Sequence, residues 1–245
     1  MALEHVTMHI PAGSFAALVG PSGGGKSTAG QLLARFWDVE SGSISFGGKD
    51  IPDYSTKALM NTVAFVFQDT YIFAESVYDN IAMHQNVTQE AVEYAAKAAR
   101  CHDFIQALPE GYHTKLGDGG HKLSGGEAQR IAIARAILKN TPIVVLDEAM
   151  AFTDAENELA LREGMAELLK GKTVLMIAHR LYPIQDADMI FVLENGRLKE
   201  SGTHKDLLQK HGLYAHLWDI QNETESWRMK GGAVHVSDNP AIHLS

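Results

Sequence analysis

The sequence contains a single cysteine, Cys101, among 245 residues, so no disulfide can form within the chain. One unpaired cysteine is typical of a protein in a reducing compartment. No apolar run approaches the roughly 18 residues that are needed to cross a bilayer, and the first residues lack the pattern of a signal peptide. The chain as it stands is therefore expected to be soluble.

Positive charge is also scarce, because 21 Lys and Arg residues stand against 30 Asp and Glu residues, a formal net charge of −9. A nucleic-acid-binding face needs Lys and Arg to meet the phosphate backbone, so nucleic acid is not expected as a partner. Hydrophobic residues make up 45% of the chain, which is enough to bury a full core in one large domain or two subdomains.

One glycine-rich segment, residues 20–28, has the complete pattern G-x-x-x-x-G-K-[ST] of a phosphate loop. The apolar run Phe15–Val19 before it predicts a buried strand, and residues 29–36 after it predict a helix. In such a unit the glycines let backbone N–H groups converge on phosphate, while the helix dipole and Lys26 add positive charge. Ser27 can offer its hydroxyl to Mg²⁺. The predicted nucleoside-triphosphate site comprises Gly20, Pro21, Ser22, Gly23, Gly24, Gly25, Lys26, Ser27 and Thr28.

A second apolar strand, starting at Val144, delivers two carboxylates at its end, Asp147 and Glu148. Ligands sit at this edge of an open parallel sheet. Asp147 is placed to hold the Mg²⁺ shell, and Glu148 to accept a proton from an attacking water. By itself, this pair would also be compatible with two ordinary acidic residues at an exposed strand end. The complete phosphate loop in the same chain favours a nucleotide site.

The segment Ser124–Glu127 opens a helical run to about Lys139 and has the spacing of a capping box. Ser124 would cap the helix, and the Glu127 side chain would reach back to the Ser124 N–H. Gly125 and Gly126 leave backbone N–H groups open to an approaching anion. By itself the box indicates only a well-capped helix. Beside the phosphate loop, it gives the sequence two helix N-termini that attract anions.

Strands alternate with helices along most of the chain, which predicts an α/β fold with a mainly parallel sheet and helices on both faces. A helical block between residues 88 and 139 interrupts this alternation and suggests a separate helical subdomain. From about Glu223 the chain becomes polar and Gly-rich, which predicts fraying. The other expected strands cover 6–10, 42–48, 63–67, 173–178 and a hairpin at 188–200, and the other helices cover 154–170 and short stretches around 205 and 214.

The motifs occur in a fixed order: the phosphate loop, Gln68, Leu123–Glu127, Val144–Glu148, residues 151–154 and His179. In this order the chain resembles the nucleotide-binding domain of an ATP-binding-cassette (ABC) transporter, from about Ala2 to Gln221. The Ser-Gly-Gly motif separates this family from other phosphate-loop ATPases. The resemblance implies a phosphate-loop NTPase core, an antiparallel β part and an inserted helical subdomain at about 84–139, all within a domain of residues 1–222. Residues 223–245 are then expected to form a disordered tail.

The resemblance further implies that two such domains, identical or different, face head to tail and share ATP. The turn Ser124–Gly126 of one would meet the γ-phosphate held by the other, and Asp154 would contact the opposite protomer. His179 would contact the γ-phosphate and support the attacking water. Glu127 stands where glutamine is usual and adds negative charge near the triphosphate. The implied Mg²⁺ ligands are Ser27, Gln68 and Asp147, with Gln68 also linking the metal and the water to a transmembrane partner.

Two further segments, 73–81 and 114–122, resemble exporter-type members of the family, in which the ATPase usually follows six transmembrane helices on one polypeptide. The chain is thus expected to be an excised piece of a longer polypeptide. It would start after the aromatic residue that stacks on adenine in this family, and so would lack that residue. It would act as an ATP-hydrolysing motor domain, held at the cytoplasmic face of a membrane by its transmembrane domain. The alternatives are the ATPase subunit of an importer and a soluble ABC protein. Six long apolar segments upstream in the source gene would favour the exporter.

Overall fold

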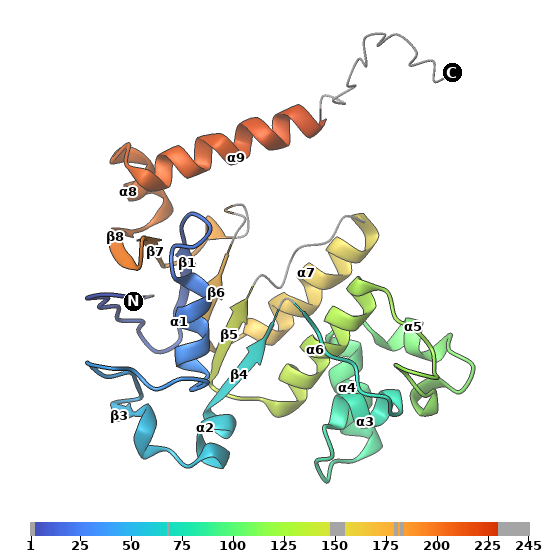
Figure 1. Cartoon of the computed structure of the whole chain (residues 1–245). Helices are drawn as coiled ribbons and strands as arrows, with labels where there is room; N and C mark the ends of the chain where they lie inside the picture. Colours follow the sequence, from blue (N-terminus) through green and yellow to red (C-terminus); the bar gives the residue numbers. More distant parts are fainter. Residues whose placement is uncertain (1–2, 68, 148–154, 179–180, 182–183, 230–245) are drawn as a thin grey trace, which may run out of the picture.

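The computed structural model describes residues 3–67, 69–147, 155–178, 181 and 184–229. Its centre is a six-stranded sheet in the order β4-β5-β6-β1-β7-β8 (Figure 1). The first five of these strands are parallel, and β8 runs antiparallel to β7, so the predicted α/β fold is confirmed. The sheet strands are β1 (Phe15–Val19), β4 (Val63–Val66), β5 (Ile143–Asp147), β6 (Thr173–Ile177), β7 (Met189–Glu194) and β8 (Arg197–Gly202). A small antiparallel pair consists of β2 (Ser45–Phe46) and β3 (Lys49–Asp50).

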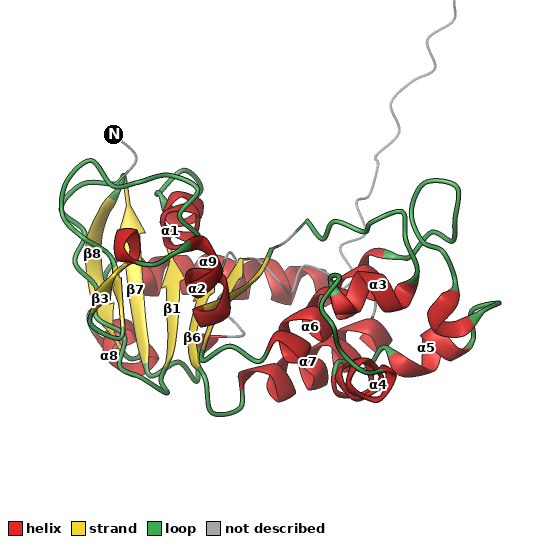
Figure 2. Cartoon of the chain, turned by 90° about the horizontal axis from the view of Figure 1, so that it is seen from below, coloured by secondary structure: helices red, strands yellow, loops and turns green. Residues whose placement is uncertain are grey.

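The helices of the middle of the chain are stacked outward from this sheet. Helices α6 and α7 lie next to the strands, and α3, α4 and α5 lie beyond α6 and α7, farther from the sheet (Figures 1 and 2). The α-helices are α1 (Lys26–Leu33), α2 (Thr56–Thr62), α3 (Val77–Ala82), α4 (Gln89–Ala98), α5 (His102–Gln106), α6 (Gly125–Lys139), α7 (Ala155–Leu169), α8 (His204–Gln209) and α9 (Leu213–Met229). Among the described residues, no helix is long and apolar enough to span a bilayer.

The core consists of two layers, one on each face of the sheet, because successive strand residues point to opposite faces. Ala16 and Leu18 of β1 belong to one buried cluster, which includes Ala29 of α1. Ala17 and Val19 of the same strand belong to the other, which includes the apolar face of α6 and parts of α7, α8 and α9. Helices α1 and α6 therefore cover opposite faces of the sheet.

The helix that follows the phosphate loop begins three residues earlier than the sequence predicted, within the loop itself, and ends at Leu33. It ends because Ala34 caps it and Arg35 adopts a left-handed conformation, with φ +55°. A Cβ added at Gly30 would lie 2.8 Å from the Ile177 side chain, so glycine here allows α1 to lie close against β6.

The predicted strand at residues 6–10 is wrong, since the described chain has no strand there. The alternation on which the prediction relied is present: Val6, Met8 and Ile10 are half-buried against the α1-side cluster, and the residues between them are exposed. An alternating burial pattern does not supply a hydrogen-bonding partner strand. The segment is instead fixed near its start, where the Glu4 N–H donates to the Gly196 carbonyl at 2.8 Å.

Within the predicted helical block, residues 88–108 are expected to be helical, with Asp103 as a candidate start of a second short helix. The structure has this division: α4 and α5 are separated at Arg100, which has φ +57°, and α5 starts at His102. Helix α3 was not predicted, although Ser76 caps it by accepting a hydrogen bond from the Asp79 N–H. The last helix, α9, continues to Met229, beyond Glu223, where the sequence predicted fraying. The hairpin with its Asn195-Gly196 turn is confirmed as β7–β8.

We expect Leu168 and Leu159, two of the leucines of α7, to differ sharply in their effect on stability. Leu168 is fully buried, so Leu168→Ala should lower the free energy of unfolding by about 2–5 kcal/mol, because it removes packing and leaves a cavity. Leu159 on the same helix is 62% exposed, and Leu159→Ala should change that free energy by less than about 0.5 kcal/mol. Urea denaturation of both variants checks this, and equal losses would contradict the packing described here.

Candidate functional site

The phosphate loop joins the carboxyl end of β1 to the first turn of α1. Gly25 is the N-cap residue, and its φ of +101° is one that L side chains rarely adopt. The Lys26 side chain is buried, and its ammonium donates to the carbonyls of Gly20 (2.9 Å) and Pro21 (3.0 Å). The first turn of α1 contains no acidic residue, and the helix dipole and Lys26 both bring positive charge to this helix end. Ser22, Gly23 and Ser27 are exposed there.

The loop is held against the hairpin β7–β8. The Gly196 N–H in the hairpin turn donates to the Gly24 carbonyl at 3.1 Å. A Cβ at Gly20 would lie only 1.9 Å from the Leu193 carbonyl oxygen, and one at Gly24 would lie 3.0 Å from the same atom. Glycine at position 20 is thus required by the approach of another backbone as well as by its φ of +144°.

Asp147 is the last residue of β5 and is partly exposed. It pairs in register with Ile177 of β6, the strand that separates β5 from β1. Because β5, β6 and β1 are parallel, Asp147 and the phosphate loop lie at the same edge of the sheet, where α1 contacts both β5 and β6. The structure therefore brings Asp147 and the α1 N-terminus with Ser27 to one edge.

The capping box at the start of α6 is confirmed. The Glu127 N–H donates to Ser124 Oγ at 3.3 Å, and Glu127 Oε2 accepts from the Ser124 N–H at 2.8 Å and from its hydroxyl at 2.9 Å. The Glu127 carboxylate is thereby turned towards its own helix, while Ser124 and Gly125 remain exposed. This turn lies on the helix that covers the face of the sheet opposite α1. Within one chain, the two predicted anion sites belong to different faces.

Four of the predicted site residues, Gln68, Glu148, Asp154 and His179, lie outside the described residues. Their roles remain predictions. The remaining residues of the predicted site divide between the phosphate loop with Asp147 and the turn Ser124–Glu127.

The two segments that resemble exporter-type domains, 73–81 and 114–122, are hydrogen-bonded to each other. The Val77 N–H donates to the Thr114 carbonyl at 3.0 Å, and the Leu116 N–H donates to the Glu75 carbonyl at 2.8 Å. A Cβ at Gly117 would lie 3.2 Å from Ala74 Cα. The segment before the Ser124 turn is therefore packed directly on the segment that follows residue 68.

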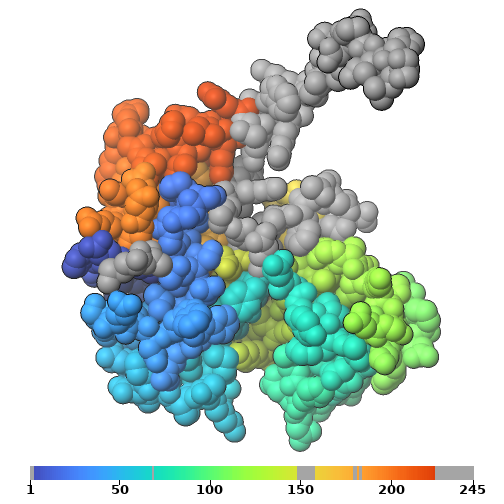
Figure 3. All heavy atoms as spheres, in the orientation of Figure 1, coloured from blue at the N-terminus to red at the C-terminus, as the bar shows by residue number. Residues whose placement is uncertain are grey.

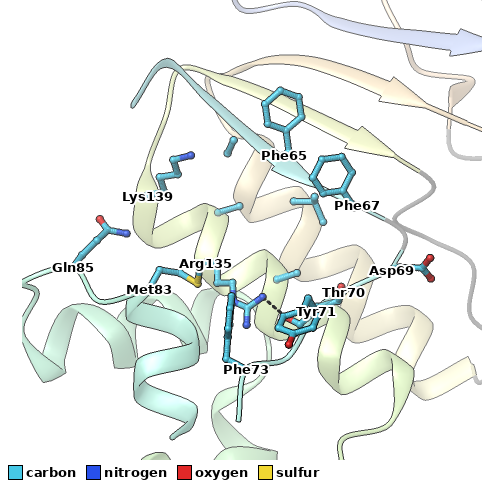
Figure 4. Close-up of a pocket in the computed structure, with 14 residues that line it drawn as sticks. Phe65, Phe67, Asp69, Thr70, Tyr71, Phe73, Met83, Gln85, Arg135 and Lys139 are labelled. Atoms are coloured by element: carbon cyan, nitrogen blue, oxygen red, sulfur yellow. Dashed lines mark hydrogen bonds between the residues drawn. The ribbon is translucent and has the colours of Figure 1, made fainter. Parts of the chain in front are cut away.

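Sequence reasoning missed a groove between β4 and the helices α3 and α6. It has a volume of about 360 Å³ and is lined by aromatic side chains, including Phe65, Phe67 and Tyr71 (Figure 4). A partly buried hydrogen bond, from the Thr70 hydroxyl to Gln129 Oε1 at 3.0 Å, joins the segment after residue 68 to α6. The signal in the sequence was the group of aromatic residues on either side of Gln68, but only the fold shows that Tyr71 and Phe73 lie beside Arg135 of α6, while Phe65 and Phe67 stack with each other at the edge strand β4.

A parallel sheet with a phosphate loop after its central strand, a carboxylate at the end of β5 and helices on both faces defines a phosphate-loop nucleoside triphosphatase. Comparison with known proteins is more specific: the profile of the family described as ABC transporter matches residues 3–151. The chain belongs to the ABC transporter family, whose ATP-binding domain binds and hydrolyses ATP.

The chain is 48% identical over 221 residues to YgaD of Bacillus subtilis (strain 168), a protein named as a multidrug export ATP-binding/permease protein. It is 47% identical over 221 residues to a protein of the same description from Staphylococcus aureus (strain NCTC 8325 / PS 47). Each match covers 90% of this chain and 38% of the relative. A solved bacterial Atm1-family ABC exporter with ATP bound superposes with a TM-score of 0.84 at 41% identity, over 97% of this chain and 40% of that one.

The contact between Gly20 and Leu193 gives a direct test of the loop. Gly20→Ala should destabilise the fold and strongly weaken ATP binding, because the new Cβ cannot fit beside the Leu193 carbonyl. Gly42 also has a positive φ, +82°, but its Cβ would meet nothing within 4 Å. Gly42→Ala should cost only about 1 kcal/mol and leave ATP affinity unchanged. Urea unfolding and nucleotide titration check both, and normal ATP binding by Gly20→Ala would contradict the described approach.

Proposed function

We propose that the chain is the ATP-driven motor domain of an exporter, and that two copies, or this chain and a similar one, enclose ATP between them. The observation that carries the proposal is the pair of anion-attracting helix N-termini on opposite faces of one sheet. One chain cannot easily direct both at the same phosphate, whereas a head-to-tail partner can supply the second. The exporter relatives and the ATP-bound exporter structure support the same function.

In this proposal the phosphate loop of one protomer holds the triphosphate. Lys26 would exchange one of its two loop carbonyls for a phosphate oxygen, and the loop N–H groups would surround the β- and γ-phosphates. The turn Ser124–Gly126 of the other protomer would approach the γ-phosphate with its open N–H groups. The Glu127 carboxylate accepts from the Ser124 N–H and hydroxyl, so the N–H groups of Gly125 and Gly126 are the ones that would be offered to the phosphate.

The donors available for Mg²⁺ fit that ion. Ser27 offers an exposed hydroxyl, Asp147 a partly exposed carboxylate and Gln68 an amide oxygen, all of them the hard oxygen donors that Mg²⁺ prefers. The described part of the chain has no cluster of three or more His, Cys, Asp or Glu residues that could hold a metal alone. This fits a Mg²⁺ ion bound through one carboxylate and the phosphates of the nucleotide. Bound there, the ion would neutralise charge that develops on the phosphates.

Hydrolysis would depend on residues at the carboxyl edge of the sheet. Glu148, which follows Asp147, would accept a proton from the attacking water, and His179, which follows the β6 segment, would support that water and contact the γ-phosphate. Asp154 would contact the opposite protomer. ATP binding would thus close the pair, and hydrolysis would release it.

The groove beside β4 is the surface that we assign to the transmembrane partner. Gln68 lies in the chain between Phe67 and Asp69, which both line the groove, so a partner docked there would be close to the proposed Mg²⁺ ligand. Tyr71, which is 71% exposed, and Met83, which is 42% exposed, offer apolar area for that contact. A motor docked in this way would act at the cytoplasmic face of the membrane, where ATP is available.

We expect Glu148→Gln to reduce ATP hydrolysis by about 10²–10⁴-fold while ATP binding is retained, because the amide keeps the size of the side chain but cannot accept the proton. Phosphate release and nucleotide titration measure the two effects separately. Glu194→Gln, the same substitution at the end of β7, is the matched control and should leave turnover close to that of the unaltered chain. Normal turnover in Glu148→Gln would remove Glu148 from the role of base.

Lys26→Ala should weaken ATP binding itself, because it removes the full positive charge at the start of α1. The dissociation constant for ATP is the quantity to measure, with Lys57→Ala, an exposed lysine on α2, as the control. An ATP affinity equal to that of the unaltered chain would contradict the assignment of the loop.

A further inference from the structure

The groove beside β4 combines an apolar rim with two cationic side chains. Tyr71 and Phe73 meet edge to face, with ring centroids 4.9 Å apart, and Phe65 and Phe67 stack at 5.8 Å (Figure 4). Figure 3 shows the surface hollowed between the blue-to-cyan part of the chain and the teal-to-green helical part. Arg135 and Lys139, one turn apart on α6, line the same groove.

Among the described residues, the groups that hold Arg135 in place are all neutral. Its guanidinium donates to the Asn80 carbonyl (2.6 Å), to Asn80 Oδ1 (2.7 Å) and to the Tyr71 carbonyl (2.8 Å), and lies over the Phe73 ring at 5.6 Å. Three of its five N–H groups are thereby used, which leaves two for another acceptor. Burial lowers the pKa of the Arg135 guanidinium to about 10, a sign that its charge has lost much of its hydration.

Lys139 also lines the groove and is partly buried. Its ammonium donates to the Val63 carbonyl at 3.1 Å, and burial lowers its pKa. In the described part of the chain, no carboxylate lies within 4.0 Å of Arg135 or of Lys139. Asp69, the acidic residue of the groove lining, projects at the opposite end of the groove from Lys139 (Figure 4).

We propose that this groove receives an acidic side chain of the transmembrane partner, seated beside an apolar residue of the same partner segment. A carboxylate above α6 would meet the two unused Arg135 N–H groups and be attracted by the nearby charge of Lys139, while the apolar neighbour would cover Tyr71 and Phe73. The proposal rests on the docking surface assigned under the proposed function and adds the chemistry that it recognises.

The surroundings favour a carboxylate on an apolar segment over other anions. A free, strongly hydrated anion would gain no contact with the aromatic rim, whereas a peptide segment with one Asp or Glu fills both parts of the groove. The chain itself carries a net charge of −9, so a second copy could also present a carboxylate, and the test must distinguish that occupant.

The test uses the 245-residue chain and short peptides from the cytoplasm-facing segments of the proposed transmembrane partner. Each peptide with Asp or Glu is compared with its Asn or Gln counterpart by fluorescence anisotropy. At least one acidic peptide should bind about tenfold more tightly than its amide counterpart, and added salt should reduce that preference. Tyr71→Ala should weaken both forms, because it removes part of the apolar rim.

Lys139→Met is the decisive variant, because Arg135 also anchors Asn80 and its loss would disturb the groove itself. It should reduce the preference for the acidic peptide severalfold while the amide form binds as before, because one of the two cations is lost and Arg135 keeps its unused N–H groups. Lys172→Met is the matched control: Lys172 is also partly buried with a lowered pKa, and it does not line the groove. Thermal unfolding confirms that both variants are folded.

The outcomes separate the two proposals. The inference of an acidic side chain would be overturned if acidic and amide peptides bound equally, or if Lys139→Met weakened both to the same extent. Either result would leave the proposed docking surface in place. Binding that Tyr71→Ala does not weaken, or no binding by any peptide, would contradict the docking surface and this inference together. Self-association of the chain that Lys139→Met abolishes would show that the occupant is a second copy.

Discussion

The close approach of the phosphate loop to the β7–β8 hairpin determines where everything else at the nucleotide site can lie. Gly20 passes the Leu193 carbonyl at a distance that no side chain could tolerate, and the hairpin turn holds Gly24 through a backbone hydrogen bond. The start of α1 is thereby fixed against the central strand of the sheet. A rigid, preorganised loop does not have to be ordered again each time that a triphosphate binds, which favours affinity.

Helix α6 connects the other functional features. Its N-terminus carries the exposed turn with Ser124, Gln129 near its middle accepts from Thr70, and Arg135 and Lys139 line the groove. At 15 residues the helix is about 22 Å long, and it packs against α3, α4 and α7. A partner that moves the groove would therefore move the Ser124 turn as part of the same rigid element. Helix α6 would therefore connect docking of the transmembrane partner in the groove with closure of the two protomers around ATP.

The sequence predicted the parts of the fold that depend on local pattern. Apolar runs located β1, β4, β5, β6 and β7, Asn195-Gly196 located the hairpin, and the Ser124–Glu127 spacing located a capping box whose hydrogen bonds are all present. The order of the strands depends on long-range packing and could not be read in this way. Long-range packing also explains the wrong prediction of a strand at residues 6–10, where burial alternates but no partner strand lies alongside.

The candidate site divided in a similar manner. The phosphate loop and Asp147 were predictable, because each motif is short and lies next to an apolar strand. The groove was not, because its cations and its aromatic residues come from segments more than sixty residues apart that meet only in the fold, as with Arg135 and the Tyr71 carbonyl (|i−j| = 64). A partly buried arginine whose hydrogen bonds go to neutral acceptors leaves no pattern in the sequence.

The central claim is that each ATP is held by the loop of one copy and the Ser124 turn of another, and mixing two inactive variants tests it most directly. Lys26→Ala disables the loop, and Gly125→Asp places a negative charge in the exposed first turn of α6, where a helix tolerates it but a γ-phosphate is repelled. If the site is shared, each variant alone is inactive, and a mixed pair contains one intact loop facing one intact turn. Recovery of ATP hydrolysis on mixing is the predicted result, and a mixture as inactive as its components would contradict the account.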